Sequence, residues 1–470
     1  MNWNQLLCPE RIRSITKSTT DRDLRTEFEK DYHRIIGSAA FRRLQDKTQV
    51  FPLDKSDFIR TRLTHSLEVS SFAKSLGQNV GEKIISGNLD PDFGLRQKED
   101  ICAILQCAGL IHDIGNPPFG HFGETAIQDW FKSNLKKLTF KGKPIEDLLN
   151  EQMKQDFYNF EGNTQALRVV SKLHFLVDEH GMNLTKALLA TIIKYPGSSL
   201  EIDKKSGNIK TKKMGYLYAE KDLFEDIEQS TGANKARHPL TYLLEAADDI
   251  AYKTADMEDS IKKNCITYSQ LLSELKASES YRNETGVYRK LVDILEHKYE
   301  KAIDNGIEKP DVYAVQNWVV SIQGQMLFCA SDSFIEHYDE IMNGTYQYDL
   351  FHGTPEEEIM ERLGDIEFRY SFTSMPIYKL EVAADTIFNF LLDRFVKAVI
   401  NYDTDEKQSV VGKRIVALIS DDYRRIYEIF SKDKSEEEKL YLRLLLATDY
   451  ICGMTDSFAK DLYQELNGIS

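Results

Sequence analysis

Apolar residues recur at intervals of three and four along most of the chain, which is the spacing of one face of an α-helix. Patterns that alternate with a period of two, as expected of half-buried strands, are scarce and short. The sequence therefore predicts an all-α fold with at most short β-hairpins, for which residues 207–220 and 345–351 are the candidates. The predicted amphipathic helices cover residues 63–84, 99–113, 164–178, 183–194, 240–258, 285–304, 311–338, 377–402, 411–431 and 434–466.

Polar intervals suggest how these helices are grouped. Residues 137–160 are charged and indicate a loop-like connection, and residues 197–238 form a Gly, Ser and Lys-rich insertion between two helices. A looser boundary falls near residues 260–285. With 470 residues, of which 41% are hydrophobic, the chain can bury a large core in more than one packed subregion. We expect a core over residues 1–260, which holds the chemistry, and a helical carboxy-terminal region over residues 261–470.

The cysteines and the amino-terminal residues indicate the cellular compartment in which the protein is expected. The six cysteines show no CxxC pair and no dense spacing, which argues against a zinc ribbon and against a secreted disulfide framework. The first residues, MNWNQLLCPERIRS, lack the pattern of a signal peptide, and no apolar stretch reaches the length of a membrane span. We expect a cytoplasmic protein with reduced thiols and no membrane partner.

The charge distribution narrows the class of ligand. A formal net charge of −15 argues against a surface that coats nucleic acid, although a local basic groove remains compatible with it. Basic residues concentrate in RRLQDKTQVFPLDKSDFIRTR, residues 42–62, directly before a histidine. These are either solvated charges or cations gathered for an anionic substrate.

The stretch GLIHDIGNPPFGHFGE, residues 109–124, combines the predicted end of a helix with more ionisable side chains than a helix end requires. Gly115 and the two prolines suffice to end a helix and turn the chain. His112, Asp113, His121 and Glu124 are not needed for that purpose. Each of them alone has a structural interpretation as a hydrogen-bonded or capping residue. Only partner residues elsewhere in the chain can favour a metal-binding or catalytic role.

Two other predicted helices supply such partners. His65 lies near the start of one, and Asp248, Tyr252 and Asp256 follow at i, i+4 and i+8 on one face of another. Carboxylates beside an apolar helix surface are costly to bury unless they are paired or bound to metal. We expect His65, His112, Asp113 and Asp248 to converge on a divalent cation, either Mn²⁺ or Mg²⁺, with Ni²⁺, Fe²⁺ and Zn²⁺ as alternatives.

The order His65, His112 with Asp113, and Asp248 resembles the H…HD…D pattern of HD-domain metal phosphohydrolases. More narrowly, residues 30–260 resemble the deoxyguanosine triphosphate triphosphohydrolase (dGTPase) family in several ordered blocks. The resemblance implies an HD-domain helical core and hydrolysis of a dNTP, dGTP preferred, to the deoxynucleoside and intact inorganic triphosphate. The blocks are FRRLQDKTQVF, TRLTHSLEV, HDIGNPPFGHFGE, NFEGNTQALRV, KYP and ADDIAYKTADMED.

Catalytic residues follow from spacing together with this resemblance. His121 and Glu124 are three residues apart beyond the Pro-Pro turn, so they face the same way if a helix begins there. An imidazole oriented by a carboxylate is a common acid–base device. We expect His121 either to protonate the departing 5′ oxygen or to place the attacking water, with Glu124 orienting it. The structural alternative is a capping histidine with a first-turn glutamate.

Substrate contacts are carried over by position in the matching blocks. Arg62 matches a phosphate-contacting arginine of the family, and Asn116, Lys194 and Lys213 stand at further phosphate positions, Lys213 having a solvated lysine as its alternative. Gln49 and Val50 match the sugar site, with Gln49 and Asp256 expected at the 3′ hydroxyl. Tyr252 would pack against C2′ and exclude a ribose hydroxyl, its alternative being an aromatic core residue.

The resemblance has a departure and leaves other classes open. Asp249 stands where some relatives place a lysine, so one phosphate contact is absent or comes from elsewhere. The family uses the carboxy-terminal half for base recognition and for oligomer contacts, and relatives form dimers, tetramers or hexamers. A regulatory nucleotide or single-stranded DNA is a further expected partner. The alternatives are another HD-type phosphohydrolase, such as a nucleoside monophosphatase or an alarmone-like pyrophosphate hydrolase, and a non-catalytic nucleotide sensor.

Overall fold

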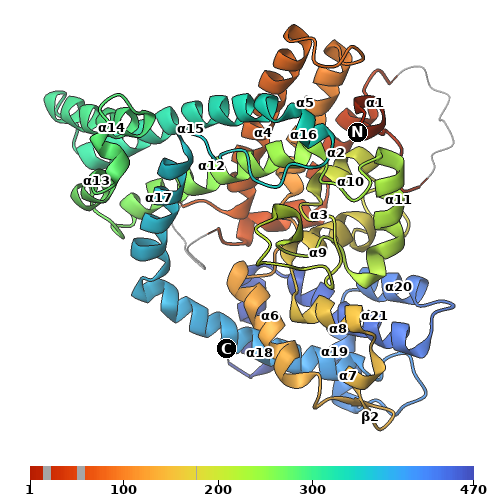
Figure 1. Cartoon of the computed structure of the whole chain (residues 1–470). Helices are drawn as coiled ribbons and strands as arrows, with labels where there is room; N and C mark the ends of the chain where they lie inside the picture. Colours follow the sequence, from red (N-terminus) through yellow and green to blue (C-terminus); the bar gives the residue numbers. More distant parts are fainter. Residues whose placement is uncertain (14–22, 50–58, 176, 470) are drawn as a thin grey trace.

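The structure, a computed structural model, describes residues 1–13, 23–49, 59–175 and 177–469 and is built mainly of α-helices (Figure 1). The helices of the first half are α1 (Trp3–Leu6), α2 (Glu27–Ile36), α3 (Ala39–Arg43), α4 (Arg62–Ser86), α5 (Leu95–Ile111), α6 (His121–Asn134), α7 (Ile145–Leu148), α8 (Glu151–Tyr158), α9 (Gly162–Arg168), α10 (Lys186–Ile192), α11 (Lys221–Thr231) and α12 (Pro239–Lys262). Those of the second half are α13 (Tyr268–Lys276), α14 (Val287–Asp304), α15 (Pro310–Glu336), α16 (Tyr338–Met342), α17 (Glu357–Glu367), α18 (Met375–Val399), α19 (Val410–Leu418), α20 (Asp421–Phe430), α21 (Glu436–Cys452) and α22 (Asp456–Leu466).

Short non-α turns complete the secondary structure. Turns of 3₁₀-helix occur at η1 (Leu44–Asp46), η3 (Ile209–Thr211), η4 (Tyr218–Glu220) and η5 (Glu279–Arg282). Single π-helical turns extend α9 and α17 at η2 (Val169–Leu173) and η6 (Phe368–Phe372). Within the described residues, the one sheet is the antiparallel pair β1 (Thr139–Phe140) and β2 (Lys143–Pro144). The all-α prediction is therefore confirmed.

Two long predicted helices are each divided in the structure. The helix expected over residues 411–431 is α19 and α20, because Ile419 takes an extended conformation and Ser420 then precedes a new helix. The helix expected over residues 434–466 is α21 and α22, with Gly453 ending the first and Thr455 capping the second. Helical periodicity continued across both breaks, which is why the sequence pattern missed them.

The predicted hairpins at residues 207–220 and 345–351 are wrong. Residues 207–220 form two 3₁₀ turns, with Asp203 and Asn208 holding a local loop, and Ile209 N donates to Gln347 O across the two segments. The interval 137–160, expected to be a loop, contains β1, β2, α7 and α8, and the insertion 197–238 contains α11. The division at residue 260 stays a prediction.

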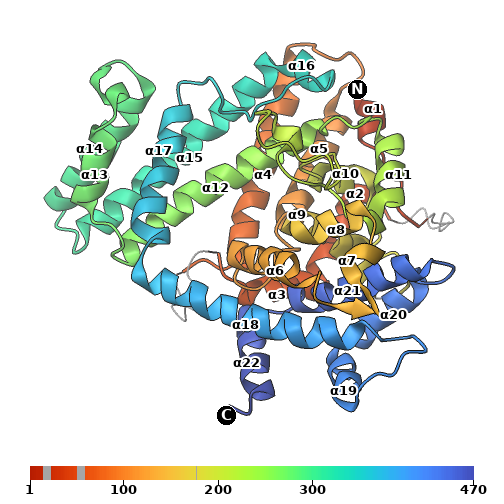
Figure 2. The same ribbon diagram turned by 60° about the horizontal axis from the view of Figure 1, so that its bottom comes forward.

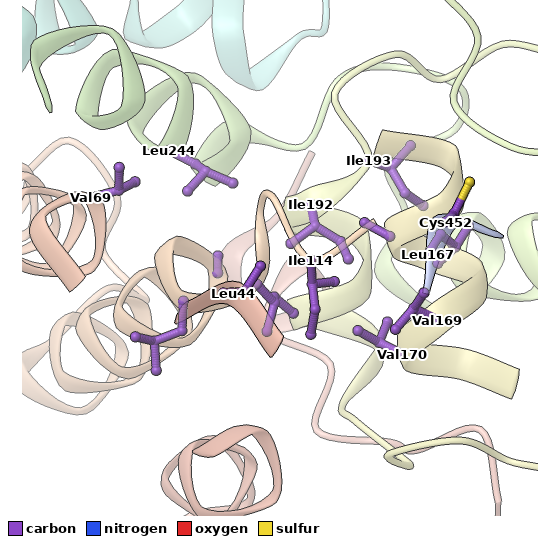
Figure 3. Close-up of a cluster of buried hydrophobic side chains, with 14 of the residues drawn as sticks. Leu44, Val69, Ile114, Leu167, Val169, Val170, Ile192, Ile193, Leu244 and Cys452 are labelled. Atoms are coloured by element: carbon purple, nitrogen blue, oxygen red, sulfur yellow. The ribbon is translucent and has the colours of Figure 1, made fainter. Parts of the chain in front are cut away.

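The main hydrophobic core of the described residues runs through both halves of the chain. It includes Val69 of α4, Ile114 after α5, Leu244 of α12 and Cys452 of α21, all buried, several of which lie in the cluster of Figure 3. The long helix α18 lies along one side of the molecule beside α6 and α19, whereas α13 and α14 lie at one extremity beside α15 (Figures 1 and 2). In the part of the chain that is described, no helix combines the length and apolarity needed to cross a membrane.

The turn between α21 and α22 anchors two loops from the first half of the chain. The buried Lys47 ammonium donates to the carbonyl oxygens of Asn116 and of Cys452, the latter at 2.7 Å. The buried Asp456 carboxylate accepts from Thr48 N at 3.0 Å and from Phe119 N at 2.9 Å. Residues more than 300 positions away thus fix the segments that carry Gln49 and His121.

Candidate metal centre and adjoining pocket

His65, His112, Asp113 and Asp248 converge from α4, the end of α5 and α12, as the sequence predicts. Asp248 Oδ1 lies 3.2 Å from His65 Nε2 and 3.3 Å from His112 Nε2. Asp113 Oδ2 lies 3.6 Å from His112 Nε2. Each imidazole is buried, and the two rings meet edge to face with centroids 5.3 Å apart. Asp248 therefore contacts both histidines, whereas the group whose ligand atoms all lie within 4.8 Å of one another consists of His65, His112 and Asp113 and leaves Asp248 out.

Local structure explains why these groups can meet. His112 directly follows α5, and its Nδ1 lies 2.8 Å from Gly109 O, which directs Nε2 toward the carboxylates. A Cβ at Gly115 would stand 2.0 Å from Ala166 N, so only glycine lets this loop pack against α9. The turn continues through Phe119 and Gly120, both with φ of +59°, and α6 then begins at His121.

The donor set fits a divalent cation. His112 Nε2 is buried and lacks a hydrogen-bond partner although carboxylate oxygens surround it. Ligand atoms of His65, His112 and Asp113 all lie within 4.8 Å of one another. Imidazole nitrogens and carboxylate oxygens together suit borderline to hard divalent ions, and this set does not distinguish among them. Such an ion would bind His112 Nε2, the buried nitrogen that has no hydrogen-bond partner in the protein.

The predicted phosphate cations stand next to this centre, and each pairs with a carboxylate. Arg62 pairs with Asp113, and Lys194 Nζ lies 2.9 Å from Asp248 Oδ2. Burial opposes charge on both aspartates, but the cations and His112 outweigh it and hold both pKa values below the ordinary range. Asn116 Nδ2 donates to Asp113 Oδ1 at 2.7 Å. Lys213 Nζ lies 2.7 Å from Glu161 Oε2.

His121 and Glu124 form the expected pair in the first turn of α6. His121 Nδ1 lies 2.8 Å from Glu124 Oε2, and Glu124 Oε1 accepts from Gly162 N at 2.7 Å. Glu124 is buried, whereas 75% of the His121 side chain is accessible. The hydrogen bond to Glu124 raises the pKa of His121 above its usual range. The second ring nitrogen, Nε2, is thereby left for another partner.

These groups border a cavity of about 740 Å³. Its lining includes predicted residues, namely Gln49, Arg62, Asp113, Asn116, His121, Lys194, Lys213, Asp248 and Tyr252. The carboxamide oxygen of Gln49 is buried without a partner. Asp256 is buried beside Tyr252 and is not among the lining residues, and Val50 lies outside the described residues.

The far wall of the cavity comes from the second half of the chain. Gly364 and Glu367 of α17, Phe368 and Phe372 of η6, Thr373, and Tyr378 and Glu381 of α18 line it. Phe372 stacks on Tyr252 with centroids 6.5 Å apart. Sequence reasoning missed these residues, and also Glu161 on the near wall. A buried glutamate next to a helix end, such as Glu367 at the end of α17 or Glu161 before α9, has no distinctive local pattern. The NFEGNTQALRV block does contain Glu161.

Comparison with known proteins gives full-length relatives. The HD domain family matches residues 62–193. The chain is 49% identical over 475 residues to a deoxyguanosinetriphosphate triphosphohydrolase-like protein of Listeria monocytogenes, with 100% of both chains covered. It is 33% identical to a protein of the same description from Synechocystis sp., again with 100% of both chains covered. It is 31% identical to a deoxyguanosinetriphosphate triphosphohydrolase of Klebsiella pneumoniae, with 100% of this chain and 98% of that one covered.

Proposed function

Because this chain belongs to the deoxyguanosinetriphosphate triphosphohydrolase-like family of HD-domain proteins, we propose that it hydrolyses dNTPs, dGTP preferred, to the deoxynucleoside and inorganic triphosphate. One observation carries the proposal. The His65, His112, Asp113 and Asp248 cluster, the His121–Glu124 pair and the side chains of Arg62, Lys194 and Lys213 meet at one cavity. Its volume, about 740 Å³, is in the range of small-molecule sites.

A divalent cation held by His65, His112, Asp113 and Asp248 would supply Lewis-acid stabilisation of negative charge on a phosphoryl oxygen. Mn²⁺ and Mg²⁺ are the ions we propose, because carboxylate-containing sites accept both. The protein's own contribution starts with Arg62, Lys194 and Lys213. Their charges stabilise the triphosphate as it departs, since negative charge spreads over its oxygens.

In the proposed reaction, water oxygen bonds to the α phosphorus and the bond from that phosphorus to O5′ breaks. The new oxygen stays with the triphosphate, the attacking water gives up a proton to solvent, and O5′ leaves as the 5′ hydroxyl of the deoxynucleoside after gaining a proton. His121 Nε2 is the group we assign to that proton, because Nδ1 is held by Glu124 and the imidazole is accessible. The raised pKa of His121 favours the protonated form that an acid requires.

The sugar is assigned to the part of the cavity between Gln49 and Tyr252. The unpartnered Gln49 oxygen can accept a hydrogen bond from the 3′ hydroxyl, and the Tyr252 ring, backed by Phe372, leaves a flat apolar surface for C2′. A ribose hydroxyl would lose its hydration against that ring without gaining a partner. Asp256, buried beside Tyr252, supports the ring in this scheme rather than contacting the sugar.

The base is assigned to the wall formed by α17, η6 and α18. Glu367 is buried at this wall, and neither of its carboxyl oxygens has a hydrogen-bond partner. Burial and the neighbouring Asp256 raise the pKa of Glu367, and the two neighbouring N–H donor groups on one edge of guanine would stabilise the charged form of this carboxyl group. The aromatic rings of Phe368 and Phe372 offer stacking surface. This arrangement favours dGTP among the four dNTPs.

Product analysis tests the proposal. The protein is incubated with Mn²⁺ or Mg²⁺ and each of the four dNTPs or GTP, and the products are separated by anion exchange. We expect deoxyguanosine and intact triphosphate from dGTP, slower turnover of the other dNTPs, and GTP spared. Pyrophosphate or orthophosphate as the primary product would indicate another HD-type hydrolase. Binding of dNTP without turnover under either metal would indicate a nucleotide sensor.

Assembly and regulation belong to the same proposal. Homo-oligomerisation, a regulatory nucleotide and single-stranded DNA stay predictions for this chain. Light scattering after size exclusion measures the first. Kinetics with single dNTPs, with dNTP mixtures and with added single-stranded DNA measure the other two, and hyperbolic curves throughout without an effect of DNA would exclude both.

A further inference from the structure

Glu161 is a buried residue of the cavity wall with no role in the scheme so far. It precedes α9 within the NFEGNTQALRV block, and only 5% of its surface is exposed. Its oxygens Oε1 and Oε2 lie 2.9 Å and 2.7 Å from Lys213 Nζ. Asn163 Nδ2 also donates to Oε1, at 2.8 Å. The carboxylate is therefore fully engaged by groups of the near wall.

A second buried carboxylate, Glu124, lies across Gly162 from Glu161. Gly162 N donates to Glu124 Oε1, and His121 Nδ1 bonds to Glu124 Oε2. A Cβ at Gly162 would stand 2.7 Å from Glu124 Oε1, so glycine permits this close approach. Two carboxylates and two basic groups thus share a small volume and sort into the pairs His121–Glu124 and Lys213–Glu161.

The pairing of His121 with Glu124 and of Lys213 with Glu161 depends on both carboxylates being present. Burial raises the pKa of Glu161, and the neighbouring Glu124 raises it further. Burial disfavours the Lys213 ammonium, yet Glu161 and then Glu124 outweigh it and raise the pKa of Lys213. The Lys213 ammonium is therefore already attracted electrostatically by Glu124. If Glu161 were neutral, the carboxylate that still attracts this ammonium would be Glu124, the partner of His121.

We propose that Glu161 is a positioning residue that retains Lys213 and thereby reserves Glu124 for His121. The inference rests on the proposed function for its catalytic consequence, but the charge sorting itself is a property of the protein. Charged and titratable groups that face His121 are Glu124 on its own helix, Arg62 of α4, Lys213 of the insertion and Glu161 before α9. Glu161 attracts His121 directly as a nearby carboxylate, and the proposal assigns it a second effect through Lys213.

The primary test is the protonation of His121 itself, which needs no turnover. The imidazole is titrated by NMR in metal-free protein labelled at histidine, with His121→Asn to identify the signal. Glu161→Gln is expected to lower the pKa of His121 by roughly half a unit or more, because Lys213 then competes for Glu124. In a Lys213→Met background the same Glu161→Gln change is expected to lower the pKa clearly less, because only the direct attraction between Glu161 and His121 is then lost. An equal shift in both backgrounds, or none in either, would overturn the proposal.

Two further variants keep the test decisive if Glu161→Gln does not fold. Glu161→Asp retains the charge and is expected to keep the pKa of His121 near that of the wild type. Lys213→Met alone removes a cation and is expected to raise that pKa, whereas a lowered value would contradict the sorting. Glu151→Gln is the matched control, because Glu151 pairs with Lys154 at 2.7 Å on the solvent-exposed face of α8.

Kinetics then connect the sorting to turnover. Glu161→Gln is expected to lower kcat about threefold or more and to move the alkaline limb of the kcat profile to lower pH. Lys213→Met is expected chiefly to raise KM, because it removes a phosphate contact. If the His121 titration behaves as proposed while no dNTP is hydrolysed, the charge sorting stands and the proposed function fails.

Discussion

The two ends of the cavity differ in how their charges are satisfied. At the metal end, Arg62, Lys194 and Lys213 each contact a carboxylate, and His121 bonds to Glu124. At the far end, both carboxyl oxygens of Glu367 are buried without a partner, and 63% of Phe368 is exposed. Buried polar groups without partners are uncommon in folded proteins. The cations of the metal end are therefore paired before substrate arrives, with imidazole nitrogens of His65 and His112 left without a partner, whereas at the far end it is a carboxyl group that lacks one.

The largest expected effect is at the metal end. Asp248→Asn removes the charge that lies beside His65, His112 and Lys194. We expect turnover to fall on the order of a thousandfold, because the cation is lost or misplaced. Triphosphate release and metal content by mass spectrometry measure this, with the exposed Asp129→Asn of α6 as control. Full activity with unchanged metal content would remove Asp248 from the centre.

Replacing the proposed acid has the next largest effect. His121→Ala is expected to lower kcat about a hundredfold, the usual contribution of an acid–base group, while metal content is retained. Single-turnover kinetics with the enzyme in excess over dGTP measure the chemical step directly. Unchanged turnover would exclude His121 from the mechanism and favour its alternative role as a capping residue.

The pH dependence tests the partner of His121. Glu124 favours the imidazolium and raises the pKa of His121, so the protonated, active form persists to higher pH than for a free histidine and is lost as pH rises through the raised pKa. Glu124→Gln removes that charge and is expected to move the alkaline limb of kcat downward, with a loss of roughly tenfold at pH 8. A limb that does not move would contradict the assignment of that limb to His121.

Sugar discrimination tests the boundary between the two ends. Tyr252→Ala is expected to reduce the preference for dGTP over GTP about tenfold, because the ring no longer occupies the space beside C2′. Tyr252→Phe keeps the ring and is the matched control, expected to retain the preference. The ratio of kcat/KM values for the two nucleotides is the measurement. Equal ratios in wild type and Tyr252→Ala would identify Tyr252 as a core residue only.

The smallest expected effect is at the far end. Glu367→Gln keeps the shape but replaces one acceptor oxygen with a donor, so kcat/KM for dGTP relative to dATP is expected to fall severalfold. Glu361→Gln, an exposed change on the same helix α17, is the control. An unchanged ratio would move base recognition away from Glu367, without affecting the metal end.

Sequence patterns located the metal end because its residues carry their own signals. His65, His112 and Asp113, His121 and Glu124 each stand at helix starts or ends with recognisable spacing, and Asp248 and Tyr252 share one helical face. The same periodicity gave most long helices. It failed at Gly453 and at Ile419, where a single residue ends a helix although apolar spacing continues.

The far end could not be located in this way. Glu367, Phe372 and Tyr378 reach the cavity because α17 packs on α12 and α18 packs beside α6, contacts between helices that lie far apart in the sequence. No local pattern marks such residues. The hydrogen bond from Phe119 N to Asp456 could not be predicted from the sequence either. An aspartate in the first turn of a helix is ordinarily explained by its favourable interaction with the helix dipole.

The central claim, attack of water at the α phosphorus with departure of O5′, is tested most directly by isotope transfer. dGTP is hydrolysed in H₂¹⁸O with Mn²⁺, and the products are examined by mass spectrometry and ³¹P NMR. The account predicts one ¹⁸O atom in intact triphosphate, on a terminal phosphorus, and none in deoxyguanosine. Label in deoxyguanosine, or release of labelled pyrophosphate or orthophosphate in place of triphosphate, would contradict it.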